Sequence, residues 1–130
     1  MVTPVEEQPE TTTVDALLTR ARARLDRVQP QDLAQEIADG AIVIDTRDSA
    51  DREAEGALPG SVIINRNVLE WRMSPSSPTC LEGITADSRV IIVCNDGFSS
   101  SIAAAGLHDL GLPRATDLVG GYRAWRAATA

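Results

Sequence analysis

The sequence contains no lysine, because all twelve of its basic residues are arginines. This absence excludes Schiff-base and pyridoxal chemistry, which need a lysine amine, and the lysine of a Walker A phosphate-binding loop. Histidine occurs once, at His108, so a histidine-rich metal site is also excluded. Two tryptophans, one tyrosine and one phenylalanine are too few for a base-stacking platform, and a net charge of -7 repels a phosphate backbone. We therefore expect neither a metal ion nor a nucleic-acid partner.

Long apolar runs are also missing. Runs such as IVI at 42–44 and VIIV at 90–93 fall far short of the about 20 residues that span a bilayer. The opening segment, MVTPVEEQPETTT, carries three glutamates and no arginine, unlike the basic and then apolar plan of a secretory signal. We expect a cytoplasmic protein without a membrane contact. In that compartment two cysteines, Cys80 and Cys94, are too few for a disulfide scaffold, and each would act alone as a thiol.

The length of 130 residues fits one domain. Residues 1–12 are polar and acidic and contain two prolines, which predicts a disordered acidic tail before a single domain over 13–130. A helix is predicted from Thr13, with Thr12 and Asp15 as its capping pair and four arginines on a solvated outer face. Its apolar stripe consists of residues at helical spacing: Val14, Leu17, Leu18, Ala21, Leu25 and Val28.

Four apolar and β-branched segments predict strands, at 41–45, 61–65, 89–94 and 115–119. Their apolar residues are continuous rather than alternating, which indicates strands whose two faces are both covered. Helices are predicted around them: a short one from Pro30 to Gly40, a turn at 68–72, and longer ones at 99–111 and 121–128. This alternation predicts a three-layer α/β fold, in which helices cover both faces of a mostly parallel central sheet.

Cys94 ends the third predicted strand and is followed by NDGF and by three serines that open a helix. In a parallel sheet this places the thiol at the carboxyl edge, where ligand sites form. Gly97 permits a positive φ, so backbone amides can turn inward, and Ser99 or Ser100 can cap the helix whose N-terminus faces the same spot. A thiolate would be stabilised there. The competing interpretation is a small buried residue at a strand end, followed by a glycine turn.

Charged residues near the same edge have predicted roles. Asp45 and Arg47 end the first strand, and we expect an internal ion pair that supports the cysteine loop, with direct substrate contact as the alternative. Arg52 and Arg66 lie in or after loops at this edge. Their guanidinium groups are candidates to contact an anionic substrate and to offset the charge of Asp96.

Two further residues are expected to stay out of the chemistry. His108 lies opposite the apolar stripe of the predicted helix 99–111, so we expect it to face solvent rather than to serve Cys94 as a base. Cys80 follows a Ser/Pro loop and matches no motif. We expect a bystander thiol there, and a resolving cysteine is the alternative.

Taken together, four segments resemble the single-domain rhodaneses, the sulfurtransferase homology domain. The resemblance runs from about Pro30 to Trp125 and rests on IDTR (44–47), GALPGS (56–61), VIIVCNDGFSSS (90–101) and DLVGGYRAW (117–125). It implies a rhodanese-like domain in which Cys94 is the sulfur-carrying nucleophile. The substrate-binding loop whose amides cradle the persulfide would then comprise Asn95, Asp96, Gly97, Phe98, Ser99 and Ser100.

By this resemblance the protein is a sulfurtransferase without a cofactor. It would move a sulfane sulfur from thiosulfate, or from a small-molecule or protein persulfide, to a thiol or cyanide acceptor. Two positions depart from the family pattern, because its common histidine is Ala57 here and a basic loop residue is Ser99. Asp96 adds a like charge that opposes thiolate formation and repels dianionic thiosulfate. We therefore expect a neutral or weakly charged persulfide to be the better donor.

Two other functions compete with this one. A cysteine phosphatase or arsenate reductase uses a similar cradle, but its CxxxxxR loop needs an arginine where this chain has Ser100. A non-catalytic rhodanese-like binding or regulatory module is favoured by Asp96 and Ala57. The intact Cys94 and the glycine loop oppose it.

Overall fold

The computed structural model describes residues 11–130, so most of the predicted acidic tail lies outside the described residues. Within 11–130, no helix has the length and apolar character needed to cross a membrane. The elements follow one another as α1 (Val14–Ala23), the 3-10 turn η1 (Pro30–Asp32), α2 (Leu33–Ala38), β1 (Ile42–Asp45), α3 (Ser49–Glu55), β2 (Ser61–Ile63), the 3-10 turn η2 (Arg66–Val68), α4 (Leu69–Met73), β3 (Val90–Val93), α5 (Ser99–Asp109), β4 (Thr116–Asp117) and α6 (Gly121–Thr129).

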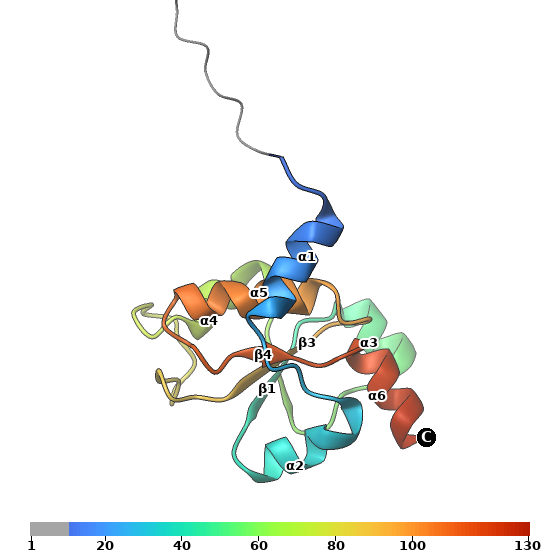
Figure 1. The fold of residues 1–130 in the computed structure, drawn as a ribbon. Helices are drawn as coiled ribbons and strands as arrows, with labels where there is room; N and C mark the ends of the chain where they lie inside the picture. The colour runs from blue at the N-terminus through green and yellow to red at the C-terminus, as the bar shows by residue number, and fades with distance from the viewer. Residues whose placement is uncertain (1–10) are drawn as a thin grey trace, which may run out of the picture.

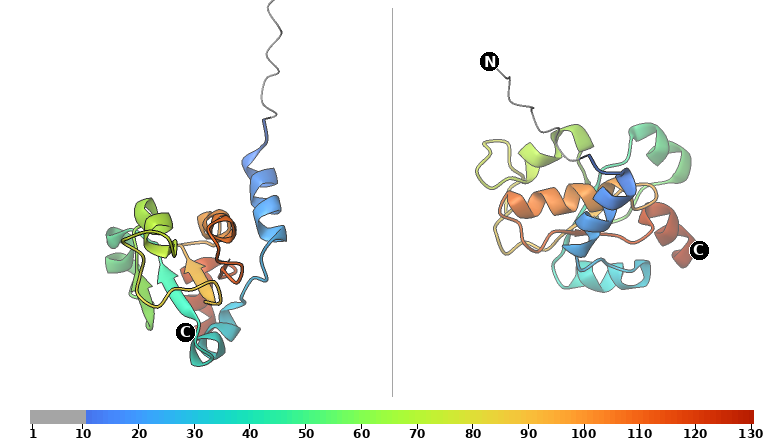
Figure 2. Two further views of the ribbon diagram at one scale, coloured as in Figure 1. Left: turned by 90° about the vertical axis from the view of Figure 1, so that its left-hand side faces the viewer. Right: turned by 45° about the horizontal axis from the view of Figure 1, so that its top comes forward.

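The four strands form one sheet in the order β2-β1-β3-β4, and every neighbouring pair is parallel. Figure 1 shows α1, α4 and α5 on one side of this sheet and α2 and α6 on the other. Both Figure 1 and the right-hand view of Figure 2 place α1 beside α5. The predicted α/β fold, with helices on both faces of a parallel central sheet, is confirmed.

The two central strands send alternate side chains into two apolar clusters. On one face Ile44 and Ile92 pack with residues of α4 and α5, among them Leu69, Met73 and Leu107. On the other face Val43 and Ile91 pack with residues of α2 and α6, among them Leu33 and Tyr122. All four of these strand residues are at most 1% exposed. Both faces of β1 and β3 are therefore covered, as the continuous apolar runs predict.

The second strand differs from the prediction. β2 spans Ser61–Ile63 instead of 61–65, and it is the outermost strand of the sheet. Val62 is 37% and Ile63 57% exposed, whereas the apolar run predicts a strand covered on both faces. An edge strand has a neighbouring strand on one side only, so its burial depends on the helices above and below it, and here that cover is incomplete.

The segment after β1 contains a helix that the apolar pattern does not indicate. α3 covers Ser49–Glu55, and none of its residues is buried. A helix without a buried face has no apolar periodicity in its sequence, so it looks like a polar loop.

The first helix is shorter than predicted. The side chain of Thr13 accepts a hydrogen bond from the Ala16 amide at 3.1 Å, so Thr13 caps the helix in place of Thr12. The chain leaves the helix after Ala23, and Val28 forms an isolated parallel bridge with Leu118 instead of a last helical turn. A β-branched residue suits either setting, so helical spacing alone cannot place Val28.

Candidate active site

Cys94 lies one residue beyond β3, at the carboxyl edge of the sheet, in the loop that leads into α5. The residue is 8% exposed, and its Sγ accepts a hydrogen bond from the Gly97 amide at 3.2 Å. The thiol opens into a hollow of about 370 Å³, which is lined by Thr46, Arg47, Asp48, Cys94, Asn95, Asp96, Phe98 and Ser99. A hollow at this edge of a parallel sheet is the usual position of a ligand site.

The pKa of the Cys94 thiol lies below its ordinary value although the residue is buried. Burial raises this pKa, because a buried thiolate loses its contact with water. Hydrogen bonds from the hydroxyls of Ser100 and Ser99 and from the amides of Ser100 and Gly97 together lower the pKa by more. The Ser100 hydroxyl also contacts Asp117, so its one hydrogen serves either acceptor. The loop therefore favours the nucleophilic form of the sulfur.

The conformation of the loop is fixed by Gly97 and by contacts with α6. Gly97 adopts the predicted positive φ, at +82°. On the other side of the loop, the first turn of α6 donates two hydrogen bonds to loop carbonyls, from Tyr122 N–H to Cys94 at 2.8 Å and from Arg123 N–H to Asn95 at 3.1 Å. These bonds fix two carbonyls of the loop toward α6, while the Gly97 amide donates to the Cys94 sulfur.

The start of α5 is not capped as predicted. Phe98 occupies the N-cap position and makes no side-chain capping bond, so neither Ser99 nor Ser100 has this role. Ser100 and Ser101 instead donate to the same oxygen of Asp117, at 2.8 and 2.7 Å. Asp117 lies on β4 and is 0% exposed. A second layer of polar groups therefore lies behind the Cys94 loop.

Asp45 and Arg47 form the predicted internal ion pair, with 2.9 Å between Nη2 and Oδ2 and both side chains fully buried. The same nitrogen of Arg47 donates to the Gly56 carbonyl at 2.9 Å. The guanidinium carbon also lies 3.6 Å from the centre of the Tyr122 ring. Arg47 lines the Cys94 hollow, so this pair forms part of its wall.

The structure does not bring Arg52 or Arg66 to the Cys94 hollow. Arg52 belongs to the unpredicted helix α3 and donates to the carbonyl of Arg47, and it lines an adjoining hollow. Arg66 pairs with Glu70 one helical turn further on, at 2.8 Å. Both contacts are local, and neither residue lines the Cys94 hollow.

The rim of the hollow is held by contacts to other elements. Asn95 donates from Nδ2 to Asp51 of α3 at 3.0 Å. Asp96 pairs with Arg123 of α6, whose Nη1 lies 2.7 Å from Oδ2, so Arg123 supplies the offsetting charge that the sequence assigned to Arg52 or Arg66. Phe98 lines the mouth of the hollow and is 59% exposed.

Two arginines that the sequence placed on a solvated helix face also contact the loop. Arg22 and Arg27 each donate from Nη2 to the carbonyl of Gly97, at 2.8 and 3.2 Å. An arginine that reaches a distant carbonyl has the same local pattern as an exposed one, so nothing in the sequence indicates these contacts. The early end of α1 also turns Arg27 to a direction that a helix through Val28 would not give it.

His108 and Cys80 lie apart from the Cys94 hollow. His108 is half-buried and its Nε2 lies 2.7 Å from the Ala115 carbonyl oxygen, so the expectation of a solvent-facing side chain is wrong. Cys80 is half-buried against the apolar cluster under α4 and α5, and both cysteines are free thiols. The bystander role of Cys80 stays a prediction.

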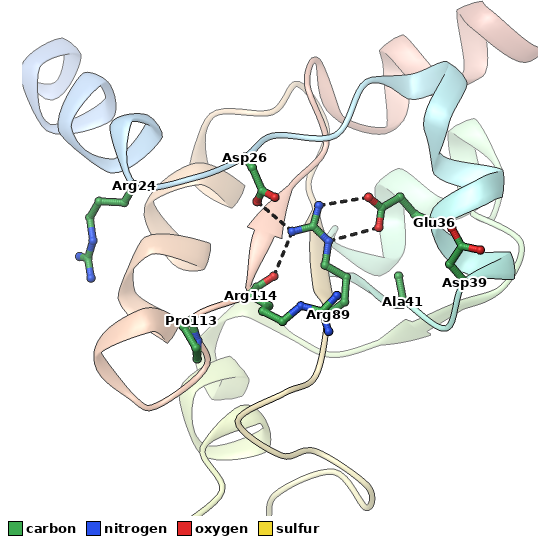
Figure 3. A pocket seen from close by; sticks show the side chains of 8 residues that line it. All are labelled: Arg24, Asp26, Glu36, Asp39, Ala41, Arg89, Pro113 and Arg114. Carbon is green, nitrogen blue, oxygen red and sulfur yellow. Dashed lines mark hydrogen bonds and ion pairs between the residues drawn. The ribbon is translucent and has the colours of Figure 1, made fainter.

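A larger hollow, of about 530 Å³, lies at the opposite edge of the sheet (Figure 3). Arg89 stands between Glu36 and Asp26, at 3.1 and 2.8 Å, and also donates to the Arg114 carbonyl at 3.3 Å. The Arg89 guanidinium is thus already paired with two carboxylates. No thiol or hydroxyl side chain lines this hollow. Cys94 and its surroundings are therefore the candidate active site.

A parallel α/β sheet with a thiolate-stabilising loop at its carboxyl edge defines a class of cysteine-based domain. Within that class, residues 29–128 match the model of the rhodanese-like domain. The chain belongs to this family, and the resemblance noted in the sequence is confirmed. No curated protein matches this chain in sequence.

Solved structures are similar along most of the chain. A protein of unknown function from Rhodopseudomonas palustris CGA009, described as a possible tyrosine phosphatase, has 28% identity and a TM-score of 0.82, with 95% of this chain and 96% of that chain covered. The human single-domain sulfurtransferase TSTD1 has 22% identity and a TM-score of 0.65 over 78% and 95% of the two chains. A rhodanese-related protein from Thermoplasma volcanium has 23% identity and a TM-score of 0.61 over 78% and 91%. The last two support the fold.

Proposed function

We propose that this protein is a sulfurtransferase that carries a sulfane sulfur as a persulfide on Cys94. The observation that carries the proposal is the Cys94 thiol, whose pKa is lowered in a buried position by hydroxyls and amides of its own loop. These donors would stabilise the negative charge of the thiolate and, one atom further out, that of a persulfide. The substrate-binding groups are those of the loop from Asn95 to Ser100.

The proposed reaction has two half-reactions and needs no cofactor. The Cys94 thiolate attacks the outer sulfur of the donor, a new S–S bond forms to Cys94, and the old bond breaks with its electron pair on the leaving group. The leaving group is sulfite from thiosulfate, or a thiolate from a small-molecule or protein persulfide. An acceptor thiolate or cyanide then attacks the outer sulfur of the Cys94 persulfide and releases the Cys94 thiolate.

A second candidate is considered because one similar structure is described as a possible tyrosine phosphatase. In cysteine phosphatases an arginine six residues after the cysteine holds the transferred phosphoryl group. This chain has Ser100 at that position, and its hydroxyl donates to Asp117. The loop therefore lacks the guanidinium that would hold a phosphoryl group at this position. Sulfur transfer is therefore the better proposal.

Intact mass spectrometry tests the proposal. The protein is incubated with thiosulfate and, separately, with glutathione persulfide, and we expect an added sulfur atom with at least one of them. Cys80→Ser should retain this sulfur, whereas Cys94→Ser should lose it and remain folded. An unloaded wild type with both donors would favour the non-catalytic binding module. Cys94-dependent release of phosphate from an aryl phosphate would favour the phosphatase instead.

A further inference from the structure

Helix α1 precedes the segment that matches the family model, which begins at residue 29. Ala21 is the one buried residue of this helix, while Val14 and Leu17 are 71% and 41% exposed. Its apolar stripe is therefore only partly covered. The helix also makes polar contacts with the Cys94 loop, which lies more than seventy residues further along the chain.

These contacts converge on one carbonyl. The Gly97 oxygen accepts hydrogen bonds from Arg22 at 2.8 Å and from Arg27 at 3.2 Å. Arg22 also donates from Nε to the Ser101 oxygen at 3.1 Å, so both ends of its guanidinium fork are used. Its guanidinium carbon lies 5.6 Å from the centre of the Phe98 ring.

Arg27 also binds the buried acid behind the loop. Arg27 forms two hydrogen bonds with Asp117, at 2.8 and 3.2 Å, and Asp117 accepts from Ser100 and Ser101 as well. The Arg27 and Asp117 side chains are 16% and 0% exposed. Arg27 thus balances a buried negative charge that contacts the first turn of α5, and that charge would otherwise oppose the Cys94 thiolate.

We propose that Arg22 and Arg27 are positioning residues, which hold the Gly97 peptide so that the Cys94 loop keeps its amides toward the sulfur. In a planar trans peptide the carbonyl and the following N–H point in opposite directions. Fixing the Gly97 oxygen on the arginine side therefore directs the Phe98 N–H to the other side. Two cationic donors also polarise this peptide, which makes its N–H a stronger donor.

The inference rests on the proposed function, because it assigns a purpose to the arginines only if the Cys94 thiolate is the reacting group. It is tested by a reaction that does not involve sulfur transfer. In a Cys80→Ser background, Cys94 is the one thiol of the chain, and its alkylation by iodoacetamide is measured as a function of pH. The rate reports the thiolate fraction directly.

For Arg22→Met we expect the alkylation rate at pH 7 to fall about fivefold, through a rise of about 0.7 in the pKa of Cys94. The rate at high pH, where the thiol is fully ionised in both proteins, should change much less. Arg22→Lys should lie between the two, because an ammonium group can reach the Gly97 oxygen but lacks the fork that also holds Ser101. Arg20→Met is the matched control on the exposed face of the same helix and should match the parent.

A second variant protects the test against loss of the fold. Arg27→Met alone leaves a buried carboxylate unpaired, so it is combined with Asp117→Asn. The two opposite charges are then lost together, and the loss of the hydrogen bond to the Gly97 oxygen should again raise the pKa of Cys94. An unchanged pH profile in folded Arg22→Met and in the folded double variant would overturn the inference. A wild type that alkylates as expected but accepts no sulfur would instead contradict the proposed function and leave the positioning result intact.

Discussion

Arg123 of α6 binds two carboxylates at once, and one of them is Asp96 on the rim of the Cys94 hollow. Its Nη1 lies 2.7 Å from Asp96, while Nε and Nη2 each lie 2.9 Å from an oxygen of Glu55. These contacts lower the pKa of Glu55 and raise that of Arg123, so both groups stay charged. The acid that most opposes an anionic donor is therefore paired, although the ion pair is exposed and open to screening by salt.

Removing this guanidinium should reveal the repulsion by Asp96. For Arg123→Met we expect kcat/KM with thiosulfate to fall about twofold to fivefold, and less with a neutral persulfide, since an exposed charge pair has only a modest effect. Asp96→Asn should have the opposite effect and improve turnover of thiosulfate. Steady-state kinetics at low and high salt check this, because high salt should shrink both effects. Arg126→Met is the control on the same helix, and equal losses with both donors would contradict a charge effect.

A second prediction concerns the close packing of α6 against the loop. Gly121 has φ +64°, and a Cβ there would lie 2.5 Å from the Cys94 carbonyl oxygen and 2.7 Å from that of Asn95. We expect Gly121→Ala to lower the free energy of unfolding by about 3 kcal/mol or more, through strain and a backbone clash. Urea denaturation measures this.

Gly111 provides the matched control. It has φ +95°, and an added Cβ would meet no atom within 4 Å. Gly111→Ala should therefore carry the backbone strain alone, about 1–2 kcal/mol. Equal costs at the two positions would mean that α6 does not press on the Cys94 loop.

The third prediction is the pH dependence of the thiol. Since the pKa of Cys94 is lowered, its thiolate forms at a lower pH than that of an ordinary cysteine. The alkylation rate should rise with pH and level off at a lower pH than for glutathione in the same buffer. Ser99→Ala should move the curve to higher pH, because it removes one hydroxyl donor. A curve that coincides with that of glutathione would contradict the stabilising role of the loop.

The sequence predicts those parts of the site that depend on neighbouring residues. The runs through Val43 and Ile91 indicate covered strands, and the step from Cys94 to Gly97 and the serines indicates a turn into a helix. Asp45 and Arg47 lie two residues apart at a strand end, so their pairing is a local matter too. Each of these predictions needs only the chain geometry of one element and its loop.

The unpredicted parts depend on contacts between distant segments. Arg123 meets Asp96, and Arg22 meets Gly97, only because α6 and α1 are folded against the loop. The pattern around Arg66 is ambiguous in the same way, since its partner could lie across the loop or one turn along the helix. Twelve arginines of similar local setting cannot be ranked until the fold brings some of them to the thiol.

The bridge between Val28 and Leu118 makes the two edges of the sheet differ in whether their backbone groups are paired. At the β4 edge, the Val28 amide donates to the backbone carbonyl of Asp117, and the Val28 carbonyl accepts from the Val119 amide. This edge is therefore already paired with another segment of the same chain. On the β2 side, no segment within 11–130 pairs with the outer edge, and Val62 and Ile63 are partly exposed. Another polypeptide could therefore add a strand only at the β2 edge of the sheet. A length of three residues keeps that side a poor template for self-association.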